Sequence, residues 1–519
     1  MIASHVMPAA RDWILSGVAV TVAAPLVAGG LAALGVADRF LRPLSVAAMA
    51  ISFVASLAIA LAWQVTDGTP VAFGAASGDG QLIFIDGLNA VLLPYVGLVL
   101  LAIVLVAPRR SLESAMVKRL LLGAAATFAL FATSHPLVLV VLWAVTAQLT
   151  WRSTRVTPGG RPAARVFAIS MWLALACMAA GTALLVADPP WERSSGLMGT
   201  AGGWLVAVAV MLRKGIFPFH SWYPALFSGA PMATALAATM PQVASYTAVR
   251  LLVGHADGVA TELEFLALFA LVTAVYGAAL ALVQRDLRGF IGALAMSQSA
   301  LVLAGLSGRL PMELNGAFCV WISSGLAITG IGLVTWALES RAGDISLETL
   351  QGRFWDAPAL AAFFLLFGMA AIGLPGTLSF VADDLIVSGS LDDQLHAGLM
   401  VIASTVLCGI AVMRCWFHVF GGPSAVDSPQ HAILPRERLT FTALIAALFV
   451  LGIWPGPLVQ ALEKAAEQVL RAPAALPPPP LAPPSIPAHP AHGAATQHLF
   501  PGSLSIMTAP SVTKGIFPC

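Results

Sequence analysis

The chain has 519 residues, a formal net charge of +1, and a composition that is 59% hydrophobic but only 10% charged. Soluble domains carry about 25% charged residues, so a soluble globular protein is excluded. We expect no nucleic-acid partner. We expect membrane lipid to surround most of the chain.

Apolar stretches recur along almost the whole chain, and a bilayer crossing requires about 20 mostly apolar residues. The sequence predicts an all-α polytopic membrane protein with about 14 transmembrane helices, because only helices and closed barrels satisfy their backbone in lipid. The expected spans are 14–37, 44–65, 86–107, 119–133, 135–151, 165–187, 198–217, 229–252, 261–283, 289–307, 314–338, 357–388, 396–420 and 439–461.

Lys and Arg are distributed unevenly between the loops. The loops after odd-numbered spans hold most of them, whereas the loops after even-numbered spans hold only Arg193, Arg250 and Arg309. Cytoplasmic loops are enriched in Lys and Arg. This pattern predicts a multi-pass protein of a bacterial inner membrane with both termini outside the cytoplasm.

Composition divides the chain into three parts. Residues 1–85 hold the first transmembrane helices, and residues 86–462 form the main transmembrane core. Residues 463–519 begin with an amphipathic stretch and continue into a proline-rich tail that includes Pro477–Pro480. Such a segment is extended and does not pack, so we expect the tail to be disordered.

Helix-breaking residues interrupt several of the expected spans. Pro231 and Pro241 lie in the eighth span, and Gly373-Leu374-Pro375-Gly376 lies in the twelfth. In transporters, discontinuous helices at matching positions in two halves of a chain point to ion sites near the midplane. The spacing of these breaks suits two similar halves related by an inverted repeat.

The segment from Arg213 to Pro224 is the least compatible with lipid. Its sequence RKGIFPFHSWYP carries two adjacent cations, two internal prolines and a histidine between two apolar runs. Unpaired charge and broken backbone are costly in hydrocarbon. The segment therefore lines a cavity or ends a helix.

The five cysteines show no zinc-binding or redox spacing, and four of them lie inside apolar spans. Glycines cluster in membrane spans rather than in a phosphate-binding loop after a strand. We expect no cofactor, no metal site and no catalytic activity from this chain alone.

Several motifs occur together in a characteristic order. They are IDGLN from Ile85, FPFHSWYP from Phe217, QRDLR from Gln284, Ser297-Gln298, GLPGTLSF from Gly373, and LGIWPGP from Leu451. In this order and spacing, residues 85–460 resemble the antiporter-like proton-translocating subunits of respiratory complex I. The Mrp antiporters, membrane-bound hydrogenases and the membrane subunit of a two-component inorganic carbon pump share this module.

The resemblance implies a fourteen-helix fold with two inverted five-helix repeats and with broken helices at spans seven and twelve. It also implies a buried line of Lys, His and Glu side chains that passes protons. Several of those positions differ here: Ala144 stands where a glutamate is expected, Arg213 for a lysine, Ala238 for a histidine, and Ser323 and Ala327 for a histidine and a lysine. A proton-transfer path needs titratable groups or water at hydrogen-bond spacing, and several of the expected titratable positions are apolar in this chain.

Arg213, Lys214 and His220 are candidate residues of a proton or ion pathway. Lys214 can release a proton, whereas Arg213 stays charged and can act only as a counter-ion. Alternatively, both cations extend to the cytoplasmic interface. His220 is either a titrating relay or a structural histidine that holds the proline-bounded turn by hydrogen bonds.

Asp383 is the candidate acid of the twelfth span, with Arg414 on the thirteenth as its expected cationic partner. Asp384 is expected to cap the second half-helix of the broken span. Gln298, with Ser297, either holds water in a proton path or bonds to a neighbouring helix.

The sequence thus favours a membrane subunit of a larger ion-coupled complex that moves protons or monovalent cations. One variant would energise inorganic carbon uptake with a soluble, zinc-containing, carbon-hydrating partner. The alternative is a conduction-deficient paralogue that anchors a soluble partner, and Ala144, Ala238 and Ala327 support it. A quinone-handling subunit is disfavoured, because no iron–sulfur ligands are present.

Overall fold

The computed structural model describes residues 3–35, 37–66, 68–75, 81–108, 114–188, 196–255, 258–308, 310–393, 395–423 and 432–471. The expected disordered tail after Arg471 lies outside these residues, as do Arg193 and Arg309. Residues up to Ala474 form one compact unit, and everything below concerns that unit.

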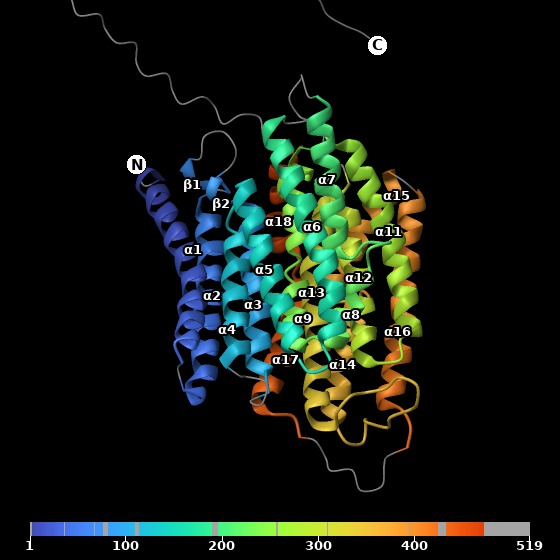
Figure 1. Cartoon of the computed structure of the whole chain (residues 1–519). Helices are drawn as coiled ribbons and strands as arrows, with labels where there is room; N and C mark the ends of the chain where they lie inside the picture. The colour runs from blue at the N-terminus through green and yellow to red at the C-terminus, as the bar shows by residue number, and fades with distance from the viewer. Residues whose placement is uncertain are drawn as a thin grey trace, which may run out of the picture. The chain divides into compact units, whose positions relative to one another are not determined.

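Helices account for most of the described chain (Figure 1), which confirms the predicted all-helical membrane class. Their bounds are α1 Ala3–Ala33, α2 Asp38–Val65, α3 Gly87–Val106, α4 Ser114–Leu130, α5 Pro136–Val156, α6 Arg161–Ala187, α7 Leu197–Lys214, α8 Trp222–Gly229, α9 Met232–Thr239, α10 Val243–Leu251, η2 Val253–His255, α11 Ala260–Val283, α12 Leu287–Leu306, α13 Pro311–Ala342, α14 Pro358–Ala371, α15 Leu378–Asp393, α16 Leu395–Phe420, α17 Pro435–Ile453 and α18 Gly456–Arg471.

Ten of the described helices are long and apolar enough to cross a membrane, or eleven if the bent pair α17–α18 counts as one span. Helices or pairs of short helices also lie at the other expected spans: α4, α9 with α10, and α14 with α15. Those elements are shorter because prolines and glycines interrupt them. The number of fourteen crossings and the inverted repeat therefore remain predictions.

A small β-hairpin adds to the all-helical prediction. Strands β1 (Val71–Ala75) and β2 (Gln81–Ile85) pair antiparallel, with Val71 opposite Ile85. The N–H of Phe84 donates to the carbonyl of Ala132, so the hairpin is joined to the end of α4. The sequence-based prediction missed these strands because each is only five residues long and lies between long apolar helices.

The interior of the bundle is built around α13. This helix and α12 are almost completely buried, whereas α1, α2, α6 and α16 expose much of their apolar surface. Figure 1 shows α13 in the middle of the helices, with α1 and α2 on one side and α16 on the other. A helix that is hydrophobic all round belongs in such an interior, and the outer helices turn apolar side chains to lipid.

Three interruptions divide otherwise continuous spans. α7 ends at Lys214, and Gly215 follows in the left-handed conformation (φ +69°), which ends the helix. The α9–α10 break comprises residues 240–242 and contains Pro241. The α14–α15 break comprises residues 372–377 and contains Pro375. The predicted breaks at Pro241 and Pro375 are therefore confirmed.

Candidate functional site

Lys214 points into the bundle, although it is the last residue of α7. Its side chain is buried, with only 3% of the residue exposed. The ammonium Nζ donates to Oε1 of Gln242 at 2.6 Å and to Oγ of Ser245 at 2.7 Å. No carboxylate of the described chain forms an ion pair with it. The alternative of a lysine extending to the interface does not fit this geometry.

Gln242 can reach Lys214 because it lies in the α9–α10 break. Its backbone is left-handed (φ +54°), which is uncommon for a residue other than glycine. Two carbonyls that the break leaves without helical partners are satisfied from other helices. The Tyr95 hydroxyl donates to the carbonyl of Met240 at 2.7 Å, and the Trp321 indole N–H donates to that of Pro241 at 3.2 Å. The break is therefore closed on its α3 and α13 sides.

A glycine on α13 makes room for Tyr95. A Cβ atom placed on Gly325 would clash with the Tyr95 hydroxyl oxygen. Only glycine leaves this space, so the close approach of α3 and α13 depends on it. The small residue explains how a tyrosine reaches the broken helix.

Arg213 points the other way from Lys214, toward α5. Its Nη1 donates to the carbonyl of Trp143 at 2.9 Å, and its Nη2 donates to Oγ1 of Thr146 at 2.7 Å. The guanidinium also lies over the Trp143 ring, 4.7 Å from its centroid, a cation–π contact. The two adjacent cations thus form hydrogen bonds on opposite sides of α7.

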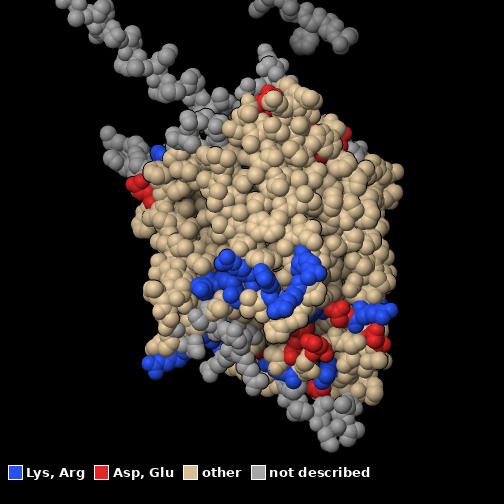
Figure 2. Space-filling model, viewed as in Figure 1, with Lys and Arg blue, Asp and Glu red and all other residues tan. Residues whose placement is uncertain are grey.

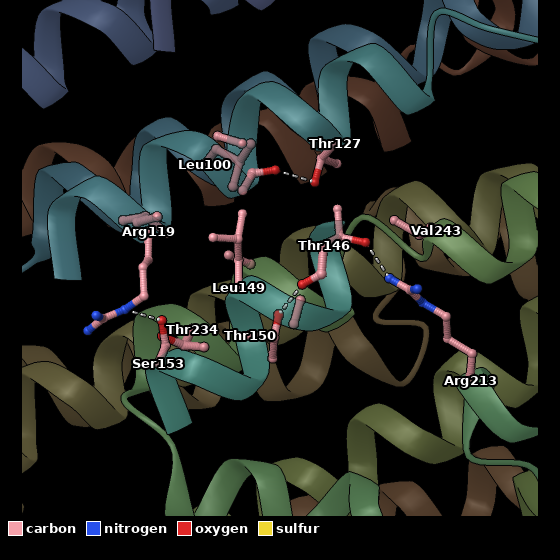
Figure 3. A pocket seen from close by; sticks show the side chains of 15 residues that line it. Leu100, Arg119, Thr127, Thr146, Leu149, Thr150, Ser153, Arg213, Thr234 and Val243 are labelled. Atoms are coloured by element: carbon pink, nitrogen blue, oxygen red, sulfur yellow. Dashed lines mark hydrogen bonds between the residues drawn. The ribbon is translucent and has the colours of Figure 1, made fainter. Parts of the chain in front are cut away.

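A cavity beside Arg213 carries a row of hydroxyl groups (Figure 3). Thr146, Thr150 and Ser153 line it from one face of α5, with Arg213 at one end and Arg119 of α4 at the other. The hydroxyls of Thr146 and Thr150 donate to helix carbonyls. Their oxygens can therefore accept hydrogen bonds from the cavity side, as Thr146 does from Arg213. Such a lining suits water molecules.

His220 lies in the turn between α7 and α8. Its Nε2 is 3.0 Å from the Tyr276 hydroxyl, and its ring stacks on Phe217. Its Nδ1 is buried, with no hydrogen-bond partner in the described part of the chain. These contacts fit a histidine that holds the turn against α11, and they leave one ring nitrogen unused.

Gln298 is buried on α12, where its amide Nε2 lies 3.8 Å from Sγ of Cys408. Its neighbour Ser297 donates to the carbonyl of Ala274 at 2.7 Å and lies 3.2 Å from the Ser404 hydroxyl. Both side chains thus contact neighbouring helices, which is the second of the two roles expected for them.

Asp383 lies on α15, shortly after the α14–α15 break, and is half-buried. Its carboxylate faces Gly373, because a Cβ atom on that glycine would be 2.6 Å from Oδ2. Gly373 has a left-handed backbone (φ +82°). Within the described residues, Asp383 forms neither a hydrogen bond nor an ion pair.

Two expectations about this region were wrong. Arg414 does not pair with Asp383, since its guanidinium instead donates to the carbonyl of Leu282 at the end of α11. Asp384 is not a helix cap, because α15 begins at Leu378 and Asp384 is exposed more than a turn inside it. Both errors arose because sequence spacing does not fix the direction of a side chain or the first residue of a helix after a break.

A buried ion pair was not expected from the sequence. Arg250, which was expected in a loop, lies on α10 and pairs with Asp86 at the start of α3, with Nη1–Oδ2 at 2.6 Å and Nη2–Oδ1 at 3.0 Å. The Asp86 side chain is 5% exposed and that of Arg250 is 9% exposed. Asn89 accepts a further hydrogen bond from Arg250. The only signal in the sequence was that Asp86 stands in the IDGLN motif.

The structure also locates the three alanines that stand at expected titratable positions. Ala238 lines the hydroxyl cavity, and Ala144 is half-buried on α5 beside Trp143. Ala327 is fully buried on α13. Between Glu313 and Glu339, α13 has no acidic or basic side chain.

Comparisons with known proteins find a family model, relatives and solved structures that are similar to this chain. Residues 164–410 match the family model described as NADH:quinone oxidoreductase/Mrp antiporter, TM. NADH-quinone oxidoreductase subunit M of Mycobacterium tuberculosis is 25% identical over 272 residues, which cover 52% of this chain and 49% of that protein. The chain thus matches about half the length of this curated relative.

Two solved structures show the same fold over nearly the whole described bundle. A chain of respiratory complex I from Thermus thermophilus has a TM-score of 0.78 at 21% identity, covering 87% of this chain and 98% of the other. A chain of the Mrp complex from Dietzia has a TM-score of 0.79 at 19% identity, covering 87% and 97%. Residues 164–410 of this chain thus match the NADH:quinone oxidoreductase/Mrp antiporter transmembrane family, and the fold of the bundle is that of these two membrane-complex chains.

Proposed function

We propose that this chain moves protons across a membrane as one subunit of a larger complex, and that Lys214 is the group that binds and releases them. The observation that carries the proposal is the Lys214 ammonium, buried at a helix break and held by two neutral acceptors. A buried cation without a carboxylate partner is costly and is characteristic of functional sites in membranes.

The neighbours of Lys214 suit both of its protonation states. Gln242 and Ser245 accept hydrogen bonds from the ammonium. When the lysine is neutral, the Ser245 hydroxyl can turn and donate, and the Gln242 amide can present its N–H₂ group. Arg213 cannot replace Lys214 in this role, because a guanidinium keeps its proton.

The hydroxyl cavity supplies a route toward this site. It extends along α5 from Ser153 to Thr146, and it is also lined by Ala238 and Val243, which flank the α9–α10 break that holds Gln242. Water held by these hydroxyls could carry protons over this distance.

Asp383 is the corresponding candidate in the second half of the chain. It lies beside a helix break, is half-buried, and has no hydrogen-bond partner among the described residues. Its carboxylate is thus available to exchange a proton. His220 and Gln298 are proposed to shape the path between the two breaks, while Arg414 is left as a structural cation near α11.

The test replaces Lys214 in the assembled complex and measures proton movement across sealed membrane vesicles with a pH-sensitive dye. Lys214→Gln keeps a polar side chain but cannot carry a proton, so we expect at least a tenfold loss of flux, in line with removal of a group essential for proton transfer. Lys214→Arg keeps the charge but not the titration, and it should be equally impaired.

The matched control is Lys464→Gln, an exposed lysine on α18. It should leave proton flux unchanged. If Lys214→Arg supports normal flux, Lys214 is only a fixed charge and the proposed role is incorrect. Assembly is checked in each case by co-purification of the other subunits.

One observation favours a second function, that of a conduction-deficient anchor. The middle of α13 has no titratable side chain, and the α9–α10 break facing it is closed by Tyr95 and Trp321. Protons would then have no lateral route from Lys214 to the second half. Normal activity of the complex with both Lys214→Gln and Asp383→Asn, together with normal assembly, would establish this anchor role.

The partner and the cellular setting are part of the proposal. The relatives are named as subunits of quinone oxidoreductases and of an Mrp complex, so we infer that this chain also assembles with other membrane subunits, in a bacterial inner membrane with both termini outside the cytoplasm. Coupling to inorganic carbon uptake through a soluble zinc-containing protein rests on the resemblance of the motifs alone. Identification of the proteins that co-purify in mild detergent distinguishes this branch from a respiratory one.

A further inference from the structure

Four arginines surround a hollow where α5 ends and α6 begins. Arg152 and Arg155 come from the last turns of α5, and Arg161 and Arg165 come from the first turns of α6. All four side chains are exposed. The residues that line the hollow include no Asp or Glu. We call this feature the arginine hollow.

The arginines of each helix repel one another. Arg152 and Arg155 are three residues apart, and Arg161 and Arg165 are four apart, so each pair lies on one helix face, where like charges are destabilising. Figure 2 shows a band of basic side chains across this face, with a wide uncharged surface above it and mixed charges below. A bound anion would relieve this repulsion.

The start of α6 adds a second attraction for an anion. Its N-cap residue Gly160 provides no side-chain hydrogen bond to the free N–H groups of the first turn. The N-terminus of a helix carries partial positive charge and favours anions. Arginines at this end are unfavourable by themselves, because cations stabilise the other end of a helix.

Apolar surface continues from the hollow along both helices. Ile169, Trp172 and Leu173 of α6 and Val141 and Val145 of α5 are all exposed, with Ile169 one turn beyond Arg165. Beside the arginines, Trp151 stacks under the Arg155 guanidinium, 5.1 Å from its ring centroid. Tryptophan side chains are enriched at the interface between lipid headgroups and hydrocarbon.

We propose that the arginine hollow binds the phosphate of an anionic phospholipid, whose acyl chains lie along the exposed apolar side chains of α5 and α6. The planar guanidinium forms paired hydrogen bonds with phosphate oxygens, which a lysine cannot do. Basic pockets between transmembrane helices are known headgroup sites. The site is independent of the proposed proton path.

A lipid fits this surface better than an acidic protein segment does. The charges occupy one end of the two helices, and the adjoining surface is apolar rather than polar. A phospholipid has the same division between a charged head and an apolar body. An acidic peptide would satisfy the arginines but would leave the apolar side chains uncovered.

The test measures the phosphatidylglycerol that stays bound to the full-length protein during detergent washing, by mass spectrometry. The variant carrying R152Q, R155Q, R161Q and R165Q should retain at least tenfold less lipid than the wild type, since each arginine near a headgroup contributes roughly a fivefold factor in affinity. The single variant Arg155→Gln should lose about fivefold on the same basis, and one substitution perturbs the fold less than four do.

The matched control is Arg39→Gln, which removes an exposed arginine that also stacks on its aromatic neighbour, Phe40. It should retain lipid like the wild type. Replacing all four arginines with lysine should retain less lipid than the wild type but more than the glutamine variant. Equal retention by the wild type and the glutamine variant overturns the proposal. Loss of an acidic partner subunit in place of lipid overturns it as well.

Discussion

The two helix breaks that carry charged residues differ in how their surroundings satisfy them. At the α9–α10 break, Tyr95 and Trp321 donate hydrogen bonds to two carbonyls that lack helical partners. Gln242 and Ser245 accept hydrogen bonds from the Lys214 ammonium. At the α14–α15 break, two glycines adopt positive φ angles, and the Asp383 carboxylate has no bonded partner among the described residues. One break is fixed by distant helices, while the other is held mainly by its own turn.

The two breaks therefore differ in how precisely each charged group is positioned and in how easily it can exchange a proton. A charge that is bound from several sides is well positioned, but it can exchange a proton only if its partners rearrange. A carboxylate with no bonded partner exchanges more freely but is less precisely placed. Stability measurements can test the contrast, because substitutions at the first break should cost more than substitutions at the second.

The largest effect is expected from Arg250→Met, which removes the ion pair between the last turn of α10 and Asp86. The substitution leaves the Asp86 carboxylate buried without its cation, a situation that costs about 3–5 kcal/mol. The free energy of unfolding, measured by titrating the purified protein with SDS in mixed micelles, should fall by that amount. Arg285→Met removes an exposed arginine paired with Glu348 and should change stability little. Equal effects of the two substitutions would contradict the assignment.

Next in size is Gly325→Ala, which closes the space that Tyr95 occupies. The added methyl group would displace the Tyr95 hydroxyl from Met240, so overpacking and a lost hydrogen bond act together, and we expect a loss of about 3 kcal/mol. Gly30→Ala is the matched control, because that glycine lies in α1 with nothing within 4 Å of the added carbon. The same unfolding titration should show it neutral or slightly stabilising.

Tyr95→Phe should have a smaller effect and compares the two breaks directly. Removing the hydroxyl leaves the Met240 carbonyl buried without a partner, at a cost of about 1–2 kcal/mol. Thr377→Val removes a hydrogen bond that Thr377 makes to Leu374, within the turn of the other break. Its cost, by the same titration, should be lower. A larger cost for Thr377→Val would show that the two breaks do not differ as described.

The smallest stability effect is expected for Asp383→Asn. The substitution removes no hydrogen bond or ion pair of the described structure, so the free energy of unfolding should change by less than about 0.5 kcal/mol. Proton flux in vesicles that contain the assembled complex should nevertheless fall. A large loss of stability would reveal a binding partner for this carboxylate and would make the open character of the break untenable.

The local features of this membrane protein could be predicted from its sequence. Hydropathy located the helices, and Pro241 and Pro375 located two breaks, because lipid solvation and proline stereochemistry act over a few residues. The motif around Phe217 indicated the resemblance to the family whose model matches residues 164–410. These signals depend on composition and on neighbouring residues, and they need no knowledge of which helices touch.

The contacts of the candidate site could not be predicted in this way. Asp86 and Arg250 are 164 residues apart, and Lys214 and Gln242 are 28 apart. The expected pair between Asp383 and Arg414 failed although both residues lie on neighbouring helices, since the Arg414 side chain turns toward α11. Which face of a helix meets its neighbour is decided by packing, as Gly325 illustrates, and a single sequence does not contain that information in readable form.

The last described helix has a consequence for how the protein is made. α18 turns by 78° from α17, and its Gln468 side chain accepts from the N–H of Gly87 and donates to the carbonyl of Gly68. Gly87 and Gly68 are thus hydrogen-bonded to a residue that follows them by 381 and 400 positions. During synthesis Gly68 and the start of α3 lack these partners until α18 has been made. A nascent chain stalled before that point should remain susceptible to quality-control proteases, whatever the state of its earlier helices.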